Sequence, residues 1–435
     1  MQHFLRLVAA GVFALLSGAA SAQTIEFATV DPSAVAFATF NSNTQKIARN
    51  KNGTLVAYLK DSNAAYDAQR VNFVRIDASG TQTLLLSEVH ATNAPCIEAS
   101  ATGEFFAAFS DWSLGVVRVY IWRDISVSTV PEKYAYSTAG SGKFSCSFDE
   151  NRRILYYLGY DGKLVRFGVD GLQFGASTLW YQASNVAQYP NLQASRDGSL
   201  HVFWNTLTGT AVSYRGVQYL TTPNDAVNWY RNWHPAGSAN FWLQSPTNYM
   251  PVASDETGAS FSLSRGEDYV RNSYLLAAYA DDEVMGAFWQ STPNYMERCF
   301  GNEKRCTAVL VMYDRKTAAR VTQMVPMLIG RNPIRPQGGG GFVKRGSSLH
   351  VIWSERSDIV VAKLTGNLLT EVAREAIPGA TDANCPYSLT VEKGNSTDSD
   401  IVGVLTLLDT TCSNWATSTG SPPITGSVLR FKIAL

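Results

Sequence analysis

The sequence predicts an all-β protein, a single β-propeller whose chain winds into a ring of four-stranded sheets. One phrase recurs: residues 188–204 read Q-Y-P-N-L-Q-A-S-R-D-G-S-L-H-V-F-W, and residues 335–353 read R-P-Q-G-G-G-G-F-V-K-R-G-S-S-L-H-V-I-W. Apolar residues alternate over short runs that Gly, Asn and Asp turns interrupt, which is the signal of strands and hairpins. Turns recur mostly at a spacing of roughly 50 residues, near the period of propeller repeats: glycines mark them at Gly53, Gly103, Gly198, Gly258 and Gly346, and charged turns near residues 152 and 399 fill the gaps.

The repeats follow one another along the chain. Seven segments each combine an innermost strand, a turn and further strands: 45–77, 95–122, 144–169, 188–216, 249–313, 335–364 and 385–435. The step from Gly258 to Gly346 is longer than the others, so seven sheets is the prediction and eight the alternative. In the fifth segment, Y-L-L-A-A-Y-A (274–280) is expected to follow the turn at Gly258 as a second strand. A β-sandwich does not explain a phrase that returns at this period.

The segment 24–40 precedes the first repeat and contains a short apolar strand, I-E-F-A-T-V. In a ring that closes on itself, a strand from the start of the chain can complete the last sheet. We therefore expect this segment to pair with the seventh repeat.

The first 22 residues have the composition of a secretory signal peptide. A basic start is followed by an apolar run from Leu7 to Leu16 and by the small-residue triplet Ala20-Ser21-Ala22. The run is shorter than the roughly 20 residues that span a bilayer. We expect cleavage after Ala22, a β-propeller domain over 23–435, and a secreted or periplasmic protein without membrane insertion.

Composition limits the classes of partner. Lys and Arg total 36, as do Asp and Glu, so no overall field attracts nucleic acid or an acidic membrane. Aromatic residues make up 11% of the chain, which supplies a large core and many flat recognition surfaces. We expect a monomer that binds no nucleic acid.

Six cysteines in an exported chain indicate disulfides rather than a metal site. Their proximity along the chain and their places in the repeats predict three pairs among the fifteen sets of pairings that six cysteines allow. The predicted pairs are Cys299–Cys306, Cys385–Cys412 and Cys96–Cys146.

In a propeller, the loops before each innermost strand and after each second strand converge at one mouth of the channel. The candidate site residues are the titratable, polar and aromatic residues of these loops. As catalytic residues we nominate His90, Tyr189, Tyr249 and Arg335, and as ligand-binding residues Asp111, Trp112, Tyr160, His234, Asn248, Glu355, Arg356 and Tyr387. Aromatic faces bury the C–H surfaces of sugars while polar groups bind hydroxyls and carboxylates.

Other polar groups have a structural interpretation. His201 and His350 recur at one repeat position, in L-H-V-F-W and L-H-V-I-W, which indicates a role in packing. The acidic group at 281–283, and Asp398 with Asp400, lack the ligand pattern of an EF-hand and are interpreted as solvated turns. No cofactor is expected, although a structural calcium ion stays open.

The blade phrase S-R-D-G-S-L-H-V-F-W resembles the repeats of sialidase-like, or BNR-type, propeller proteins over most of the chain after residue 22. Their Asp-box, S-x-D-x-G-x-T-W, is absent, and Arg335-Pro336 does not match their R-I-P motif, so no catalytic role is transferred from them. The resemblance implies a propeller of a kind used on glycans by hydrolases, lyases and lectins.

Two functions follow. The first is recognition of a poly- or oligosaccharide at the channel mouth, with cleavage as a lyase or a glycosidase left open. A lyase needs a base such as Tyr or His and an Arg for the uronate carboxylate, whereas a hydrolase needs two carboxylates, here Asp111 and Glu355. The alternative is a non-catalytic binding or assembly protein of the cell envelope that uses the same face for a protein partner.

Overall fold

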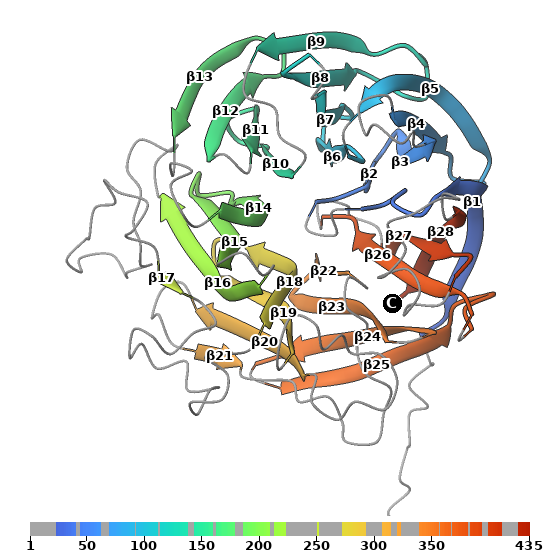
Figure 1. The fold of residues 1–435 in the computed structure, drawn as a ribbon, viewed down its shortest axis with the longest axis vertical. Coiled ribbons are helices and arrows are strands. Elements are labelled where there is room, and N and C mark those ends of the chain that lie inside the picture. The colour runs from blue at the N-terminus through green and yellow to red at the C-terminus, as the bar shows by residue number, and fades with distance from the viewer. Residues whose placement is uncertain are drawn as a thin grey trace, which may run out of the picture.

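The computed structural model describes residues 23–40, 44–61, 69–91, 93–111, 114–137, 143–159, 162–178, 186–208, 213–222, 250–251, 272–292, 307–314, 320–322, 339–355, 357–366, 368–381, 383–393, 399–410 and 425–435. These residues confirm the all-β propeller class, and their strands form seven four-stranded antiparallel sheets (Figure 1). Within the described residues, no helix is long and apolar enough to cross a membrane.

Each of the first three sheets uses four strands that are consecutive in the chain. The first contains β2 (Ile47–Asn50), β3 (Gly53–Asp61), β4 (Gln69–Ile76) and β5 (Gln82–Ala91). The second contains β6 (Cys96–Ala99), β7 (Phe105–Asp111), β8 (Val116–Trp122) and β9 (Glu132–Ser137). The third contains β10 (Phe144–Asp149), β11 (Ile154–Gly159), β12 (Lys163–Gly168) and β13 (Gln173–Thr178).

The next three sheets repeat this order. The fourth contains β14 (Val186–Ala194), β15 (Leu200–Thr208), β16 (Ser213–Thr222) and β17 (Met250–Pro251). The fifth contains β18 (Asn272–Ala280), β19 (Val284–Thr292), β20 (Thr307–Asp314) and β21 (Arg320–Thr322). The sixth contains β22 (Gly340–Arg345), β23 (Ser348–Glu355), β24 (Asp358–Thr365) and β25 (Leu368–Ala376).

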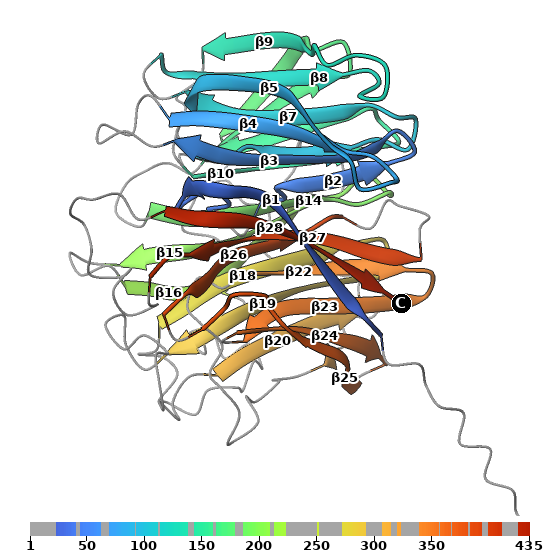
Figure 2. The ribbon, with the colours of Figure 1, turned by 90° about the vertical axis from the view of Figure 1, so that its right-hand side faces the viewer.

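The last sheet joins the two ends of the propeller. Its order is β26 (Cys385–Val391), β27 (Asp400–Leu408), β28 (Thr425–Ala434) and then β1 (Ile25–Val35). Ile25 pairs with Ile433, and Figure 2 shows β1 lying along β28. The expectation that the early segment completes the seventh repeat is confirmed.

The innermost strands form a closed circle around the axis. Contacts run in order from β2 through β6, β10, β14, β18 and β22 to β26, and β26 in turn contacts β2. At one junction, Gly339 forms a parallel bridge with Leu389, and a Cβ at Gly339 would lie 2.2 Å from the Leu389 carbonyl oxygen. Only glycine fits this close approach, which explains the glycine-rich start of the sixth repeat.

Apolar side chains fill the space between sheets. Phe73 of the first sheet packs against Trp122 of the second with ring centroids 5.1 Å apart, and both side chains are buried. Such aromatic pairs contribute packing beyond their buried area. The turn glycines Gly53, Gly103, Gly198 and Gly346 all have positive φ, as turns that reverse a strand tightly require.

The prediction for the fifth repeat is wrong in its strand order. Met250–Pro251 is the fourth strand of the fourth sheet, where it pairs with β16, and 274–280 lies in β18, the innermost strand of the fifth sheet. The turn after it is the acidic Asp281–Glu283 rather than Gly258, which lies outside the described residues. Alternating apolar residues do not distinguish an inner strand from a second strand, so the missing turn glycine misled the assignment.

Candidate functional site

The channel has two ends of different construction. At the turn end, each innermost strand reverses into the second strand of its sheet; at the opposite loop end, the chain enters each innermost strand. Because the strands are antiparallel, the last residues of β5, β7 and β23 also lie at the loop end. The predicted convergence of these loops at one mouth therefore agrees with the topology.

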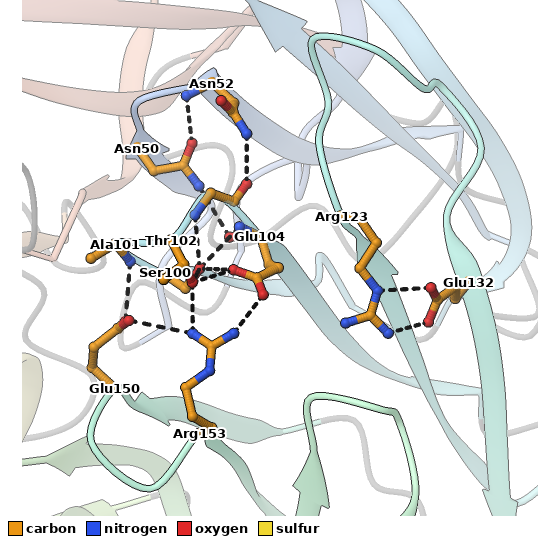
Figure 3. Close-up of polar contacts among 11 residues, drawn as sticks. Asn50, Asn52, Ser100, Ala101, Thr102, Glu104, Arg123, Glu132, Glu150 and Arg153 are labelled. Atoms are coloured by element: carbon orange, nitrogen blue, oxygen red, sulfur yellow. Dashed lines mark hydrogen bonds and ion pairs between the residues drawn. The ribbon is translucent and has the colours of Figure 1, made fainter.

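Polar contacts link the turns of neighbouring sheets all the way around the turn end. Between the first and second sheets, the Asn52 amide donates to the Gly103 carbonyl at 3.2 Å (Figure 3). Between the second and third, the Ala101 N–H donates to the Glu150 carboxylate at 3.1 Å. The further links of this turn ring are Arg152 to the Gly198 carbonyl, the Asp197 N–H to Asp282, Lys344 to Asp281, Arg345 to Glu392, and Arg49 to Glu392.

Glu104 shows how strongly one carboxylate is held in the turn ring. It accepts bonds from the Ser100 and Thr102 hydroxyls and pairs with Arg153 of the third sheet (Figure 3). Burial alone would raise the pKa of Glu104, but these partners lower it to about 2. The carboxylate is therefore an ionised structural link at any physiological pH.

Glu392 closes the turn ring between the last sheet and both of its neighbours. Its side chain is fully buried between Arg49 of the first sheet, at 2.7 Å, and Arg345 of the sixth. Burial raises the pKa of Glu392, and the two arginines oppose that rise. A buried carboxylate with two cationic partners is costly to leave unpaired.

The loop end is built from aromatic rings that meet across the axis. Phe40, which precedes β2, stacks on Tyr387 of β26 with centroids 6.2 Å apart and an interplanar angle of 9°. The same ring meets the edge of Tyr189 in β14, also at 6.2 Å. Phe37 packs on Phe40 at 5.6 Å. Sheets far apart around the circle thus share one aromatic cluster, Phe37, Phe40, Tyr189 and Tyr387.

Two innermost strands bend where they enter this aromatic cluster. A β-bulge interrupts the pairing of β14 between Gln188 and Asn191, and another interrupts β26 between Tyr387 and Thr390. Within these bulges Tyr189 and Ser388 have positive φ, 54° and 47°. Such backbone conformations are unfavourable for residues other than glycine and concentrate at functional sites.

Lys143 adds a cation to the aromatic cluster. It directly precedes β10, and its Nζ lies 4.4 Å from the centroid of the Tyr189 ring. Burial lowers the pKa of the Lys143 amine to about 8. An amine with this pKa is partly neutral near pH 7 to 8, so it can accept a proton. Lys143 was not among the residues nominated from sequence, and its only sequence signal is its place in a loop before an innermost strand.

The structure places four of the nominated residues. Tyr189 and Tyr387 lie in the aromatic cluster and are buried. Asp111 ends β7, where Arg118 of its own sheet binds it at 2.8 Å; Glu355 ends β23, where Arg374 of its own sheet binds it at 2.7 Å. Because their sheets are not neighbours, the structure does not bring Asp111 and Glu355 together as the carboxylate pair of a hydrolase.

The other nominated residues lie outside what the structure describes. The backbone of His90 lies in β5, but its side chain is not described. The remaining ones are not described: Trp112, Tyr160, His234, Asn248, Tyr249, Arg335 and Arg356.

Among the disulfide predictions, Cys96–Cys146 is confirmed. Cys385 is disulfide-bonded, but its predicted partner Cys412 is outside the described residues, as are Cys299 and Cys306.

The buried histidines serve packing in the two repeats that share them. His201 is fully buried, and its Nδ1 lies 2.8 Å from the Tyr219 hydroxyl on the neighbouring strand. His350 is also buried, which lowers its pKa.

The acidic groups considered for calcium have protein partners. Asp281 accepts from Lys344 and Tyr279, and Asp400 pairs with Arg49 and Lys432; Asp398 is undescribed. Among described residues, the one cluster with metal-ligand types is Cys96, Glu98 and Cys146, whose two sulfurs are bonded to each other.

Comparisons with known proteins agree with the fold. No family model matches the chain, and no curated protein matches it. Among solved structures, an ulvan lyase of polysaccharide lyase family PL25 bound to GlcA(1-4)Rha3S has a TM-score of 0.58 at 8% identity, covering 89% of this chain and 94% of that chain. A second polysaccharide lyase has a TM-score of 0.53 at 9% identity, covering 94% and 99%. The WD40 repeats of RRP9 have a TM-score of 0.47 at 10% identity, covering 95% and 98%. At these identities the similarity shows the propeller fold alone.

Proposed function

We propose that the chain is an exported, seven-bladed propeller that binds a uronate-containing polysaccharide at the loop end and cleaves it by β-elimination. The observation that carries this proposal is the Lys143 amine, with its pKa lowered to about 8, placed 4.4 Å from the ring centroid of Tyr189 within an aromatic cluster. The similarity to two polysaccharide lyases supports the scaffold. Residues 1–22 direct export in this proposal.

The chemistry requires one base and one acid. The neutral Lys143 amine takes the proton from the carbon next to the uronate carboxylate, the ring C=C bond forms, and the bond to the leaving oxygen breaks. The Tyr189 hydroxyl gives its proton to the leaving oxygen, and the Lys143 ammonium then returns a proton to the phenolate. Proton transfer therefore balances without a cofactor. Phe37 and Phe40, both half-buried, offer ring faces to the sugar.

The lyase reaction is favoured over hydrolysis by the positions of the carboxylates. Glycosidases need two carboxyl groups flanking one bond. Asp111 and Glu355, the pair nominated for this role, are each held by an arginine of their own sheet.

The test is an assay of residues 23–435 on a panel of uronate-containing and neutral polysaccharides, following unsaturated chain ends and reducing sugar. Unsaturated ends are expected from a uronate polymer, and kcat/KM should rise with pH through about 8 as Lys143 loses its proton. Lys143→Met should lower kcat/KM by about 10²-fold or more, the usual contribution of a general base.

Lys133→Met is the matched control. Lys133 also lies over a tyrosine ring, Tyr120, at 5.4 Å, but it belongs to β9 at the rim of the propeller and pairs with Glu88. Its replacement should leave activity unchanged. Retained activity in Lys143→Met, or polysaccharide binding without cleavage by the unaltered protein, would refute the lyase mechanism; silence in both assays would favour a protein partner.

A further inference from the structure

A cavity opens on the axis at the turn end, away from the aromatic cluster. Its volume is about 810 Å³, within the range of small-molecule sites. Residues of the second to seventh sheets and Gln45, which precedes β2, line it, and Ala277, Ala278, Gly340 and Gly341 keep part of its wall free of bulky side chains. The turn ring of inter-sheet contacts surrounds its mouth, so its shape is held by the fold.

Three of the cations around this cavity are paired with carboxylates of the protein. Lys393 pairs with the buried Glu98 and also donates to the Ser147 hydroxyl at 3.1 Å. Lys344 pairs with both Asp281 and Glu283, at 2.7 and 2.9 Å. Arg345 pairs with Glu392. A charged ligand would compete with these ion pairs, so the wall favours an uncharged one.

Uncharged polar side chains supply the remaining recognition chemistry. Asn191, Gln193 and Ser195 alternate along β14 and the turn after it, so they project from one face, and all three line the cavity. Gln45 and Thr390 line it from other sheets, and the partly exposed ring of Tyr279 adds a flat surface.

The hydroxyl of Ser195 has hydrogen-bonding capacity that the described residues leave unused. The residue is 3% exposed, and its hydroxyl has no hydrogen-bond partner within the described residues. Buried hydroxyls without a partner are rare because desolvation costs free energy that no bond returns. A ligand hydroxyl in the cavity would satisfy it.

We propose that this cavity is a binding site for a neutral sugar, recognised by amides, hydroxyls and one aromatic face. The site is separate from the loop end and does not rest on the lyase function. It gives the propeller two carbohydrate sites of different charge preference, one at each end of the channel.

The test is saturation-transfer NMR and calorimetry on residues 23–435 with glucose, galactose, rhamnose, cellobiose and maltose, and with sodium glucuronate as the charged comparison. At least one neutral sugar should bind, and glucuronate should bind this site more weakly. Ser195→Ala should weaken that binding roughly fivefold to tenfold, the loss of one hydrogen bond. Because the hydroxyl has no protein partner, the variant should fold with undiminished stability.

Ser110→Ala is the matched control, since Ser110 is also buried and its hydroxyl has no partner in the described part of the chain, but it lies in β7 outside the cavity. The affinity of the Ser110→Ala variant for the sugar should equal that of the unaltered protein. No binding by any neutral sugar, or equal affinities in the Ser195 and Ser110 variants, overturns the proposal. Lys143→Met should keep this binding, so failure here and failure of the lyase assay are distinguishable.

Discussion

The two ends of the channel are built from different kinds of contact. At the turn end, short turns are joined by ion pairs and hydrogen bonds that pass from each sheet to the next around the whole circle. At the loop end, rings from two sheets and from the segment before β2 meet beside one lysine with a lowered pKa.

This difference indicates that the stability of the propeller and its proposed chemistry depend on opposite ends of the channel. Polar groups at the turn end are paired with one another, so their contribution is structural. At the loop end the strained Tyr189 and the desolvated Lys143 are unfavourable features that the rest of the fold must hold in place. Changes to the ion pairs of the turn ring should therefore act on stability, and changes at the loop end on activity.

The largest effect is expected at Glu392. Glu392→Gln removes the buried anion between Arg49 and Arg345, so each arginine loses one ion pair, while Arg49 keeps its pair with Asp400. The free energy of unfolding should fall by about 3–5 kcal/mol, measured by urea denaturation. A loss of unfolding free energy below about 1 kcal/mol would mean that the buried Glu392 carboxylate does not stabilise the turn end.

Phe40→Ala should have a smaller effect on stability and a large one on activity. The ring contacts Tyr189 and Tyr387 but is half-buried, so roughly 2 kcal/mol is expected, below the value for a fully buried phenylalanine. Thermal unfolding and the lyase assay measure the two quantities. Full activity in this variant would argue that the aromatic cluster is only packing.

Lys143 should give the stability curve a characteristic pH dependence. Its pKa is about 8 in the folded chain, against an ordinary value of 10.5. Between these values the unfolded chain binds more protons, so the free energy of unfolding should rise with pH across this window and gain nothing from Lys143 below it. Denaturation at a series of pH values should show that Lys143→Met flattens the rise and Lys133→Met retains it.

The smallest effect is expected from an exposed ion pair. Arg123 and Glu132 form a bidentate pair whose side chains are 45% and 41% exposed (Figure 3). Glu132→Gln should cost less than about 0.5 kcal/mol because water screens such pairs. A cost near that of Glu392→Gln would show that burial is not what distinguishes the turn ring.

The strand pattern of the propeller was predictable because it depends on local signals. Runs such as V-V-R-V-Y-I-W became β8 without a shift, and Asn52-Gly53 forms the predicted turn. The fifth sheet was misassigned because Asp281–Glu283 turns the chain without a glycine. There, hydrogen bonds from the N–H groups of Glu283 and Val284 to the Asp281 side chain stabilise the turn.

The candidate site was predictable only in part. The antiparallel order of the strands predicts at which end of the channel the nominated loops lie. Tyr189 was correctly predicted to lie near the axis. The importance of Lys143 depends on desolvation and on a ring from another sheet, neither of which a linear pattern contains. The ion pairs of Asp111 and Glu355 were missed for the same reason, since Arg118 and Arg374 lie on other strands of their sheets.

The pairing of β1 with β28 has a consequence for how the molecule assembles. Ile25 meets Ile433 only after every residue between them has been synthesised, so the circle shuts in a late step with a high entropic cost of loop closure. Refolding should therefore be slow, and partly built forms would leave β1 unpaired and open to other chains. During synthesis β1 lacks its partner until β28, the last strand of the propeller, has been made.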